Sequence, residues 1–217
     1  MFVFFVKLYF MNRLANNLIQ KGVLKSDNII RAFSEVNRAE FVPSDMVSEA
    51  EADIPLPIGY GQTISQPTTV AIMLELLNPE EGQNILDVGS GSGWTTAILA
   101  CISGERGKVT ALERILELCE IGKDNIDKFD FLNKYQIEFQ CIDATEGFEK
   151  NAPYDRILVS AEVEEIPESF KRQLKIGGKM VIPIHNSICY VEKKSEDDFY
   201  VEEFPGFVFV PFIVKSQ

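Results

Sequence analysis

The chain has 217 residues and a formal net charge of −12, with 46% hydrophobic and 25% charged residues. This length and composition predict one globular domain, residues 1–217, with a full core. With 33 acidic and 21 basic residues, the chain lacks the net positive charge that is typical of nucleic-acid-binding proteins. No nucleic-acid partner is therefore expected. No C-x-x-C pair is present, and we expect four buried free thiols in a cytoplasmic protein: Cys101, Cys119, Cys141 and Cys189.

The first ten residues, M-F-V-F-F-V-K-L-Y-F, are strongly apolar but few. A membrane-spanning helix needs about 20 apolar residues, and a signal peptide has a basic start and a small-residue cleavage site. Neither pattern is present, so no membrane partner is expected. Two interpretations of this apolar extension, residues 1–10, stay open: translation starts at Met11, or the segment packs as an extra strand on the domain or on a partner.

The N-terminal third is predicted to be helical, with one long loop. A helix is expected over 12–20, ended by Gly22, and a second begins after the capping pair Ser26 and Asp27. Two prolines and two glycines predict a loop over 53–61, and apolar spacing predicts a helix over 68–78. Residues 11–67 are therefore expected to form a helical and substrate-loop region ahead of a core over 68–217.

From residue 84 onward, predicted strands alternate with predicted helices. Strands are expected over 84–88, 108–112, 136–140, 156–160 and 179–183, with helices over 94–102, 115–129 and 168–174. Two late strands, 188–193 and 207–212, are predicted to form a hairpin-like edge. The alternation predicts an α/β fold with a doubly wound, mostly parallel sheet, N-terminal helices and a C-terminal antiparallel edge. Such sheets bind ligands at the carboxyl ends of their strands.

A glycine-rich turn follows the first of these strands. The dinucleotide fingerprint places its third glycine three residues after the second, but that position here is Trp94. The pattern G-x-G-x-G, with an acid two residues before the first glycine, resembles the S-adenosyl-L-methionine turn of Rossmann-like class I methyltransferases. The resemblance implies that cofactor, held by Asp87, Gly89, Ser90, Gly91 and Gly93. Asp87 would orient the turn or meet the ammonium group of the cofactor.

Two further acids follow the next two strands. Glu113 lies beyond the glycines at a spacing near the roughly 20 residues at which an acid binds ribose hydroxyls. Its alternative role is that of an ordinary acid at a helix start, where it suits the helix dipole. Asp143, with Ala144 after it, is predicted to contact the adenine amino group through carboxylate or backbone; the alternative is a turn-forming aspartate.

The segment before the core carries the substrate hypothesis. Taken on its own, it is a loop leading into a helix, with Ser65 as a cap and Pro67 in the first turn. The run P-L-P-I-G-Y-G-Q-T-I-S-Q-P, however, closely resembles the protein-L-isoaspartate O-methyltransferase family. The resemblance extends to R-A-E-F-V-P at 38–43, P-Y-D-R-I at 153–157, L-K-I-G-G at 174–178 and F-V-P-F at 209–212.

The resemblance implies a repair enzyme that methylates the α-carboxylate of L-isoaspartyl residues in damaged proteins. The methyl ester then closes to a succinimide, which can reopen to aspartate. Ser65 is implied as the catalytic residue, and Gln62, Thr63 and Ile64 as residues that border cofactor and substrate. The expected partners are isoaspartyl-containing peptides or proteins, the expected state is a monomer, and no metal site is predicted. A carboxylate with a pKa near 4 needs no general base.

Departures from the family pattern keep the substrate open. Glutamates at 162, 164 and 165 stand where the family has a small-residue loop, and they would repel a carboxylate unless turned outward or paired. Ala144 also replaces a common glycine, and the only histidine, His185, is predicted to lie in a turn. The alternatives are a methyltransferase for another small-molecule or protein substrate, and a non-catalytic cofactor-binding module.

Overall fold

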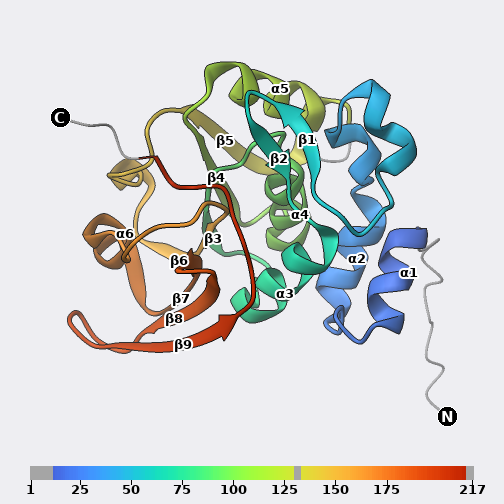
Figure 1. The fold of residues 1–217 in the computed structure, drawn as a ribbon. Coiled ribbons are helices and arrows are strands. Elements are labelled where there is room, and N and C mark those ends of the chain that lie inside the picture. The colour runs from blue at the N-terminus through green and yellow to red at the C-terminus, as the bar shows by residue number, and fades with distance from the viewer. Residues whose placement is uncertain (1–11, 130–132, 214–217) are drawn as a thin grey trace, which may run out of the picture.

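The protein is described by a computed structural model that places residues 12–129 and 133–213 (Figure 1). The predicted apolar extension, residues 1–10, lies outside the described residues. Within the described ranges, no helix is long and apolar enough to cross a membrane.

The centre of the fold is a seven-stranded sheet in the order β5-β4-β3-β6-β7-β8-β9. The first five strands in this order pair in parallel, and β8 and β9 add antiparallel strands at one edge. This arrangement confirms the predicted fold class. The strands are β3 (Asn84–Val88), β4 (Lys108–Glu113), β5 (Gln136–Cys141), β6 (Tyr154–Val159), β7 (Leu174–Ile184), β8 (Ser187–Lys193) and β9 (Phe199–Pro205).

Helices cover both faces of this sheet, and a two-stranded sheet lies beside it. The helices are α1 (Arg13–Gln20), α2 (Asp27–Glu35), α3 (Pro67–Leu77), α4 (Trp94–Ser103), α5 (Leu116–Asp127) and α6 (Glu168–Gln173). Short 3-10 helices are η1 (Arg38–Phe41), η2 (Ser44–Glu49) and η4 (Glu149–Asn151), and the small sheet pairs β1 (Leu56–Gly59) with β2 (Gln62–Ile64).

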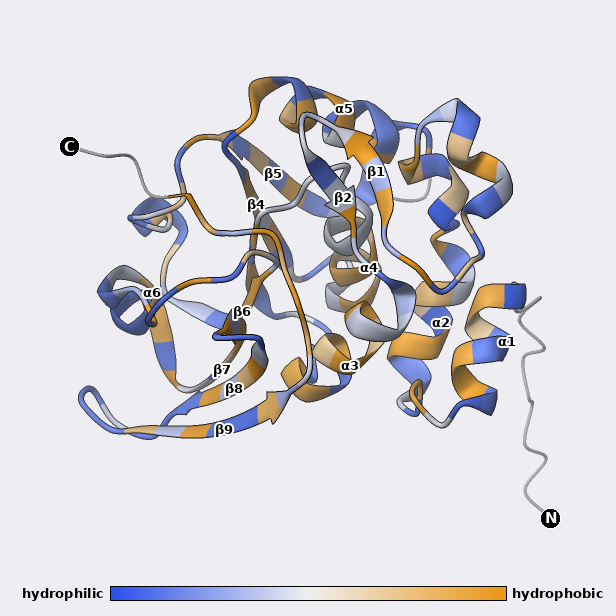
Figure 2. Cartoon of the chain, in the orientation of Figure 1, coloured by the Kyte–Doolittle hydropathy of each residue, from blue (hydrophilic) through white to orange (hydrophobic). Residues whose placement is uncertain are grey.

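Alternation along the strands creates two apolar cores, one on each face. Ile85 joins the core beneath helices α1 to α5, whereas Leu86 and Val88 join the core beneath α6. This follows from the two-residue side-chain period of a strand. Figure 1 shows α6 on one side of the sheet and α3 and α4 on the other. Figure 2 shows hydrophobic and hydrophilic residues alternating around α1 and α2, as expected of helices with one buried face.

The predicted loop over 53–61 is partly wrong, because its second half is a β-hairpin. β1 and β2 pair antiparallel, with Leu56 opposite Ile64, and both side chains are buried. Gly59, Tyr60 and Gly61 have positive φ and close the turn between them. Prolines and glycines do mark a chain reversal here, but the apolar residues between them pack on the core and extend the backbone.

The predicted strand over 207–212 is also wrong. The edge strand that pairs with β8 is β9, which sequence analysis missed because five of its seven residues are exposed and it lacks an apolar alternation. Residues 207–213 instead run back across the carboxyl ends of the parallel strands, as the red segment of Figure 1 shows. There, only Pro211 makes a bridge, to Glu162.

The expectation of four free thiols is wrong for two of them. Cys119 on α5 and Cys141 at the end of β5 form a disulfide, with Cα atoms 5.7 Å apart. Cys101 and Cys189 are free and buried. The two cysteines are 22 residues apart in sequence. Their pairing depends on how α5 packs against β5, which sequence spacing does not show.

We expect reduction of the Cys119–Cys141 disulfide to lower the free energy of unfolding. Opening a loop with a sequence separation of 22 returns conformational entropy to the unfolded chain, about 3 kcal/mol at 25 °C. Urea unfolding with and without a phosphine reductant measures the difference. The double variant Cys119→Ser, Cys141→Ser is the control, since the reductant should leave its unfolding midpoint unchanged. Four titratable thiols in unreduced, denatured protein would contradict the prediction.

Candidate active site

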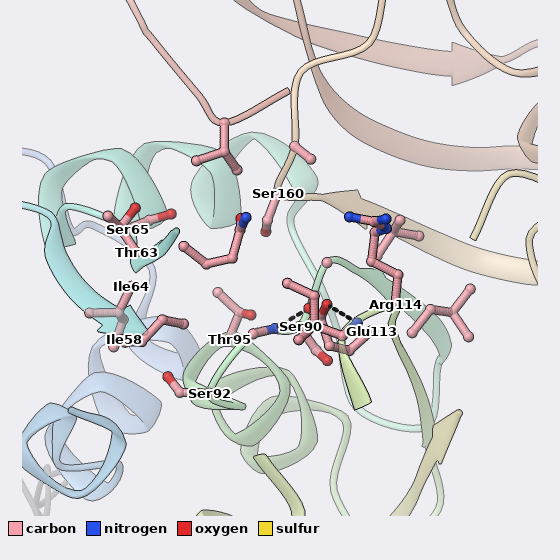
Figure 3. Close-up of a pocket in the computed structure, with 18 of the residues that line it drawn as sticks. Ile58, Thr63, Ile64, Ser65, Ser90, Ser92, Thr95, Glu113, Arg114 and Ser160 are labelled. Atoms are coloured by element: carbon pink, nitrogen blue, oxygen red, sulfur yellow. Dashed lines mark hydrogen bonds between the residues drawn. The ribbon is translucent and has the colours of Figure 1, made fainter. Parts of the chain in front are cut away.

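A cavity lies at the carboxyl ends of β3, β4 and β6. The strand order reverses at this point, because β4 and β5 follow β3 on one side and β6 lies on its other side. Ligands bind at such points in open α/β sheets. Figure 3 shows Thr63 and Ser65 at one side of the cavity and Glu113 and Arg114 at the other. The walls are residues 58, 62–65, 88–92, 94–95, 112–115, 144, 160–161 and 210–213.

The glycine turn between β3 and α4 forms the floor of the cavity. Gly91 has a φ of +53°, and a Cβ there would stand 3.2 Å from Ile58 Cδ1. Gly93 has a φ of +91°, and a Cβ there would stand 3.0 Å from the Gly122 carbonyl oxygen on α5. Both positions therefore require glycine for conformation and for space. The turn lets backbone approach a ligand closely on one side while α5 packs against it on the other.

Asp87 ends in a fully buried carboxylate below this turn. Its Oδ2 accepts hydrogen bonds from Thr95 Oγ1 at 3.0 Å and Thr96 Oγ1 at 2.6 Å, which fix the first turn of α4. Its Oδ1 has no hydrogen-bond partner. Burial raises the pKa of this carboxyl to about 6, against the two threonine hydrogen bonds, and the charge of Glu113 raises it further. A cationic ligand group would stabilise the charged form.

Glu113 closes the turn from the next strand. Its Oε2 accepts from the backbone N–H of Gly91 at 3.0 Å, and its Oε1 accepts from that of Ile115 at 2.9 Å, the Gly91 bond being drawn in Figure 3. The side chain is buried and lines the cavity. Each carboxylate oxygen has a further lone pair beyond these bonds. The geometry thus places an acid where it both supports the glycine turn and faces the cavity.

Of the remaining residues predicted to bind the cofactor, some line the cavity and others do not. Gln62, Thr63, Ile64, Gly89, Ser90 and Ala144 line the cavity, whereas Asp87, Gly93 and Asp143 stand behind the lining. Asp143 Oδ1 accepts from the backbone N–H of Thr145 at 2.9 Å and from its hydroxyl, which is the turn-forming arrangement. At this strand end, Ala144 rather than the aspartate side chain forms the wall.

Ser65 is not used as the cap of α3, although its position suits one. Asp53 caps the helix from a distance: its carboxylate accepts from the Thr68 backbone N–H at 2.9 Å and from the Thr68 hydroxyl at 2.6 Å. In the part of the chain that the structure describes, no residue hydrogen-bonds to the Ser65 hydroxyl. Ser65 lines the cavity, so a ligand there could bind its hydroxyl without displacing a protein hydrogen bond.

The segment 207–213 forms a strap over the cavity, and sequence analysis missed this role. The backbone of Glu162 holds the strap, donating from N–H to the Val210 carbonyl at 2.8 Å and accepting from the Phe212 N–H at 2.7 Å. Residues 210–213 then line the cavity. The match of F-V-P-F to the family pattern was the available signal. Arg114 was missed as well, because an exposed arginine after Glu113 has no distinctive pattern.

The glutamates of the 162–165 loop do not face the cavity. Glu162 directs its carboxylate to the backbone N–H of Asn186 at 3.4 Å, and Glu164 and Glu165 are exposed and absent from the cavity wall. The turned-outward interpretation therefore fits the geometry. His185 lies exposed in the turn between β7 and β8, with a φ of +46°, as predicted.

Two observations show that the cavity fits a nucleoside cofactor with an ammonium group. The first is the cradle at 89–93, which side chains would fill. The second is a set of buried polar atoms without a protein partner beside it, Ser90 Oγ and Asp87 Oδ1. Most buried polar groups are hydrogen-bonded in native proteins, so these atoms leave hydrogen-bonding capacity beside the turn for a ligand or water. Among the described residues, no group of three His, Cys, Asp or Glu side chains could hold a metal ion.

Comparisons with known proteins agree with this geometry. A family model described as protein-L-isoaspartate(D-aspartate) O-methyltransferase matches residues 10–217. A protein-L-isoaspartate O-methyltransferase of Methanopyrus kandleri is 42% identical over 205 residues, covering 93% of this chain and 90% of the relative. One of Archaeoglobus fulgidus is 48% identical over 173 residues, covering 80% and 79%.

A solved structure extends the likeness to three dimensions. A crystal structure of a Plasmodium falciparum protein described as a protein-L-isoaspartate O-methyltransferase, in complex with S-adenosyl-L-homocysteine, superposes with a TM-score of 0.80. It is 25% identical, and the match covers 92% of this chain and 96% of that one.

Asp87 gives a pH-dependent prediction. Its folded pKa is raised from 3.8 to about 6, so the folded protein holds a proton that the unfolded chain releases between these values. Stability from this group therefore falls as pH rises, by about 3 kcal/mol over the whole titration and by about 2 kcal/mol between pH 4 and 6. We expect Asp87→Asn to become progressively more stable than the unsubstituted protein over this range, measured by urea unfolding without ligand.

Asp53→Asn is the matched control, because the Asp53 pKa is lowered by its hydrogen bonds with Lys21 and Thr68, against its desolvation. Its stability relative to the unsubstituted protein should change in the opposite direction with pH. Parallel pH curves for Asp87→Asn and the unsubstituted protein would contradict the assignment.

Proposed function

This chain belongs to the protein-L-isoaspartate(D-aspartate) O-methyltransferase family, and we propose that it methylates the α-carboxylate of L-isoaspartyl residues in damaged proteins. The observation that carries this proposal is the unused hydroxyl of Ser65, in the wall that Gln62 to Ser65 form across from Glu113. Carbonyl and carboxylate groups of a polypeptide can enter there without displacing an existing protein hydrogen bond. The family resemblance predicted this role for Ser65.

S-adenosyl-L-methionine supplies a methyl carbon activated by its sulfonium sulfur. We assign its binding to the residues of the glycine turn and the two neighbouring strand ends. Glu113, which also holds the Gly91 N–H, would accept from the ribose hydroxyls, the bare backbone of the glycine turn would pack against the nucleoside, and Asp87 would balance the ammonium charge. The full set proposed is Gln62, Thr63, Ile64, Asp87, Gly89, Ser90, Gly91, Gly93, Glu113, Asp143 and Ala144.

The protein's contribution to the reaction is mainly alignment. The substrate carboxylate is ionised at neutral pH and needs no base, so Thr63 and Ser65 only have to hold it in line with the methyl group. Such positioning can contribute up to roughly 7–11 kcal/mol. The strap at 207–213 and Ile58 cover the cavity with apolar groups, which limits the access of water. We further propose a cytoplasmic monomer that acts on polypeptides, with neither nucleic acid nor membrane as a partner.

The substrate is tested with paired peptides that differ only in carrying aspartate or isoaspartate at one position. With a labelled methyl donor, we expect base-labile label on the isoaspartyl peptide alone. Donor binding is measured separately by calorimetry, so that an inactive protein with an intact cofactor site can be recognised. Label on the aspartyl peptide, or on neither peptide while the donor binds, would contradict the proposed substrate.

Ser65→Ala is expected to lower turnover by about 10- to 100-fold, the value of one hydrogen bond to a charged group. The affinity for S-adenosyl-L-methionine should stay within about 2-fold, because the hydroxyl is assigned to the substrate. The measurements are kcat with the isoaspartyl peptide and Kd by calorimetry. Ser44→Ala, at an exposed serine outside the cavity, is the matched control. Unchanged turnover in Ser65→Ala would remove Ser65 from the mechanism.

A further inference from the structure

Arg38 has an unusual place for an arginine. Its side chain is only 2% exposed, and its guanidinium lies within the fold behind the cavity. Every hydrogen bond that it donates ends on a backbone carbonyl: Ala50 at 2.9 Å, Ala52 at 3.3 Å, Ile54 at 3.0 Å, Ile64 at 3.5 Å and Ser65 at 3.1 Å. Burial lowers its pKa to about 10, with the charge of Asp53 acting in the opposite direction, so the group stays protonated at neutral pH.

These carbonyls lie at the two ends of one structural unit. Ile54 precedes the β1–β2 hairpin, and Ile64 and Ser65 end it. A single nitrogen, Nη2, donates to all three, so it joins the entering and the leaving chain at the base of the hairpin. The hairpin itself supplies the cavity wall at 58 and 62–64, and Ser65 follows directly. The position of that wall therefore depends on the guanidinium.

The same guanidinium contacts the opposite side of the site. Its central carbon lies 5.3 Å from the centroid of the Trp94 ring, within the range of a cation–π contact. Trp94 is the first residue of α4, directly after the glycine turn, and it lines the cavity. Arg38 thus connects the hairpin that carries Ser65 with the helix that follows the glycine turn.

We propose that Arg38 is a positioning residue for methyl transfer, which sets the Ser65 wall at a fixed distance from the glycine turn. This rests on the proposed function of the cavity. A lysine cannot replace it, because an ammonium group is a compact point charge, whereas the planar guanidinium presents five N–H donors in a rigid fork. Arg38 touches neither reacting group, so it acts through the wall that it holds.

The test compares Arg38→Lys with Arg156→Lys. Arg156 is the matched control, since it is 7% exposed, donates to the carbonyls of Asn78 and Asp155, and lies outside the cavity wall. We expect Arg38→Lys to lower kcat with the isoaspartyl peptide by about 100-fold, the cost of a misplacement near 1 Å. The Kd for S-adenosyl-L-methionine should change by less than about 3-fold. Arg156→Lys should lose stability but keep kcat at a temperature where both variants are folded.

Two readouts do not require turnover. Trp94 is the only tryptophan, so its fluorescence should change in Arg38→Lys and not in Arg156→Lys. In Arg38→Ala, guanidinium at a non-denaturing concentration should restore the emission and part of the turnover, whereas methylammonium should not. If the unsubstituted protein fails to methylate the isoaspartyl peptide, the proposed function is lost, but the emission and its rescue still decide whether Arg38 holds this wall.

The proposal is overturned by either of two results. One is a kcat and a Trp94 emission in Arg38→Lys equal to those of the unsubstituted protein. The other is an equal loss of kcat in Arg38→Lys and Arg156→Lys without rescue by guanidinium, which would leave Arg38 a general stabilising residue.

Discussion

The close approach of Gly93 to Gly122 is the constraint on which the site depends. With a Cβ at Gly93 only 3.0 Å from the Gly122 carbonyl oxygen, the turn and α5 can meet only as bare backbone. α5 then fixes the turn further, since Asn125 Nδ2 donates to the Ser92 carbonyl at 3.0 Å. Glu113 completes the frame through the Gly91 N–H. The floor of the cavity is thus built by backbone contacts, and the other walls are placed relative to it.

Sequence reasoning succeeded where the determining information is local. The strand 84–88 and the helix from Trp94 were predicted within one residue of their ends, because apolar runs and the three glycines mark them directly. It failed at the hairpin 56–64, whose shape depends on Arg38, some two dozen residues earlier, and on packing of Ile58 against Gly91. It also failed at 207–213, since the backbone hydrogen bonds between Glu162 and this segment join distant parts of the chain. Arg38 itself, in a polar run, gives no sign of burial.

Within the described ranges, two buried charged groups beside the cavity have no partner of opposite charge at hydrogen-bond distance. Asp87 is fully buried with one oxygen unpartnered, and Arg38 is buried among neutral carbonyls rather than beside a carboxylate partner. Both pKa values are shifted toward the neutral form, so folding without ligand is opposed by each group. Such groups are retained in a fold when they position or bind something. For Asp87 the proposed match is the ammonium group of the cofactor, whereas the Arg38 guanidinium is matched by the backbone carbonyls at the hairpin ends.

The way in which α3 is capped leaves the Ser65 hydroxyl available. Ser65 lies one residue before the N-cap, Gln66, and a local bond from its hydroxyl to the first turn would leave that hydroxyl occupied. Asp53 takes over that bond, and Gln66 Nε2 donates to the Asp53 carbonyl at 2.9 Å, which ties the capping residue to the helix it caps. Of the polar groups of Ser65, Arg38 binds the backbone carbonyl and not the hydroxyl. The Ser65 carbonyl is held by Arg38, and its hydroxyl is left beside the cavity without a protein partner among the described residues.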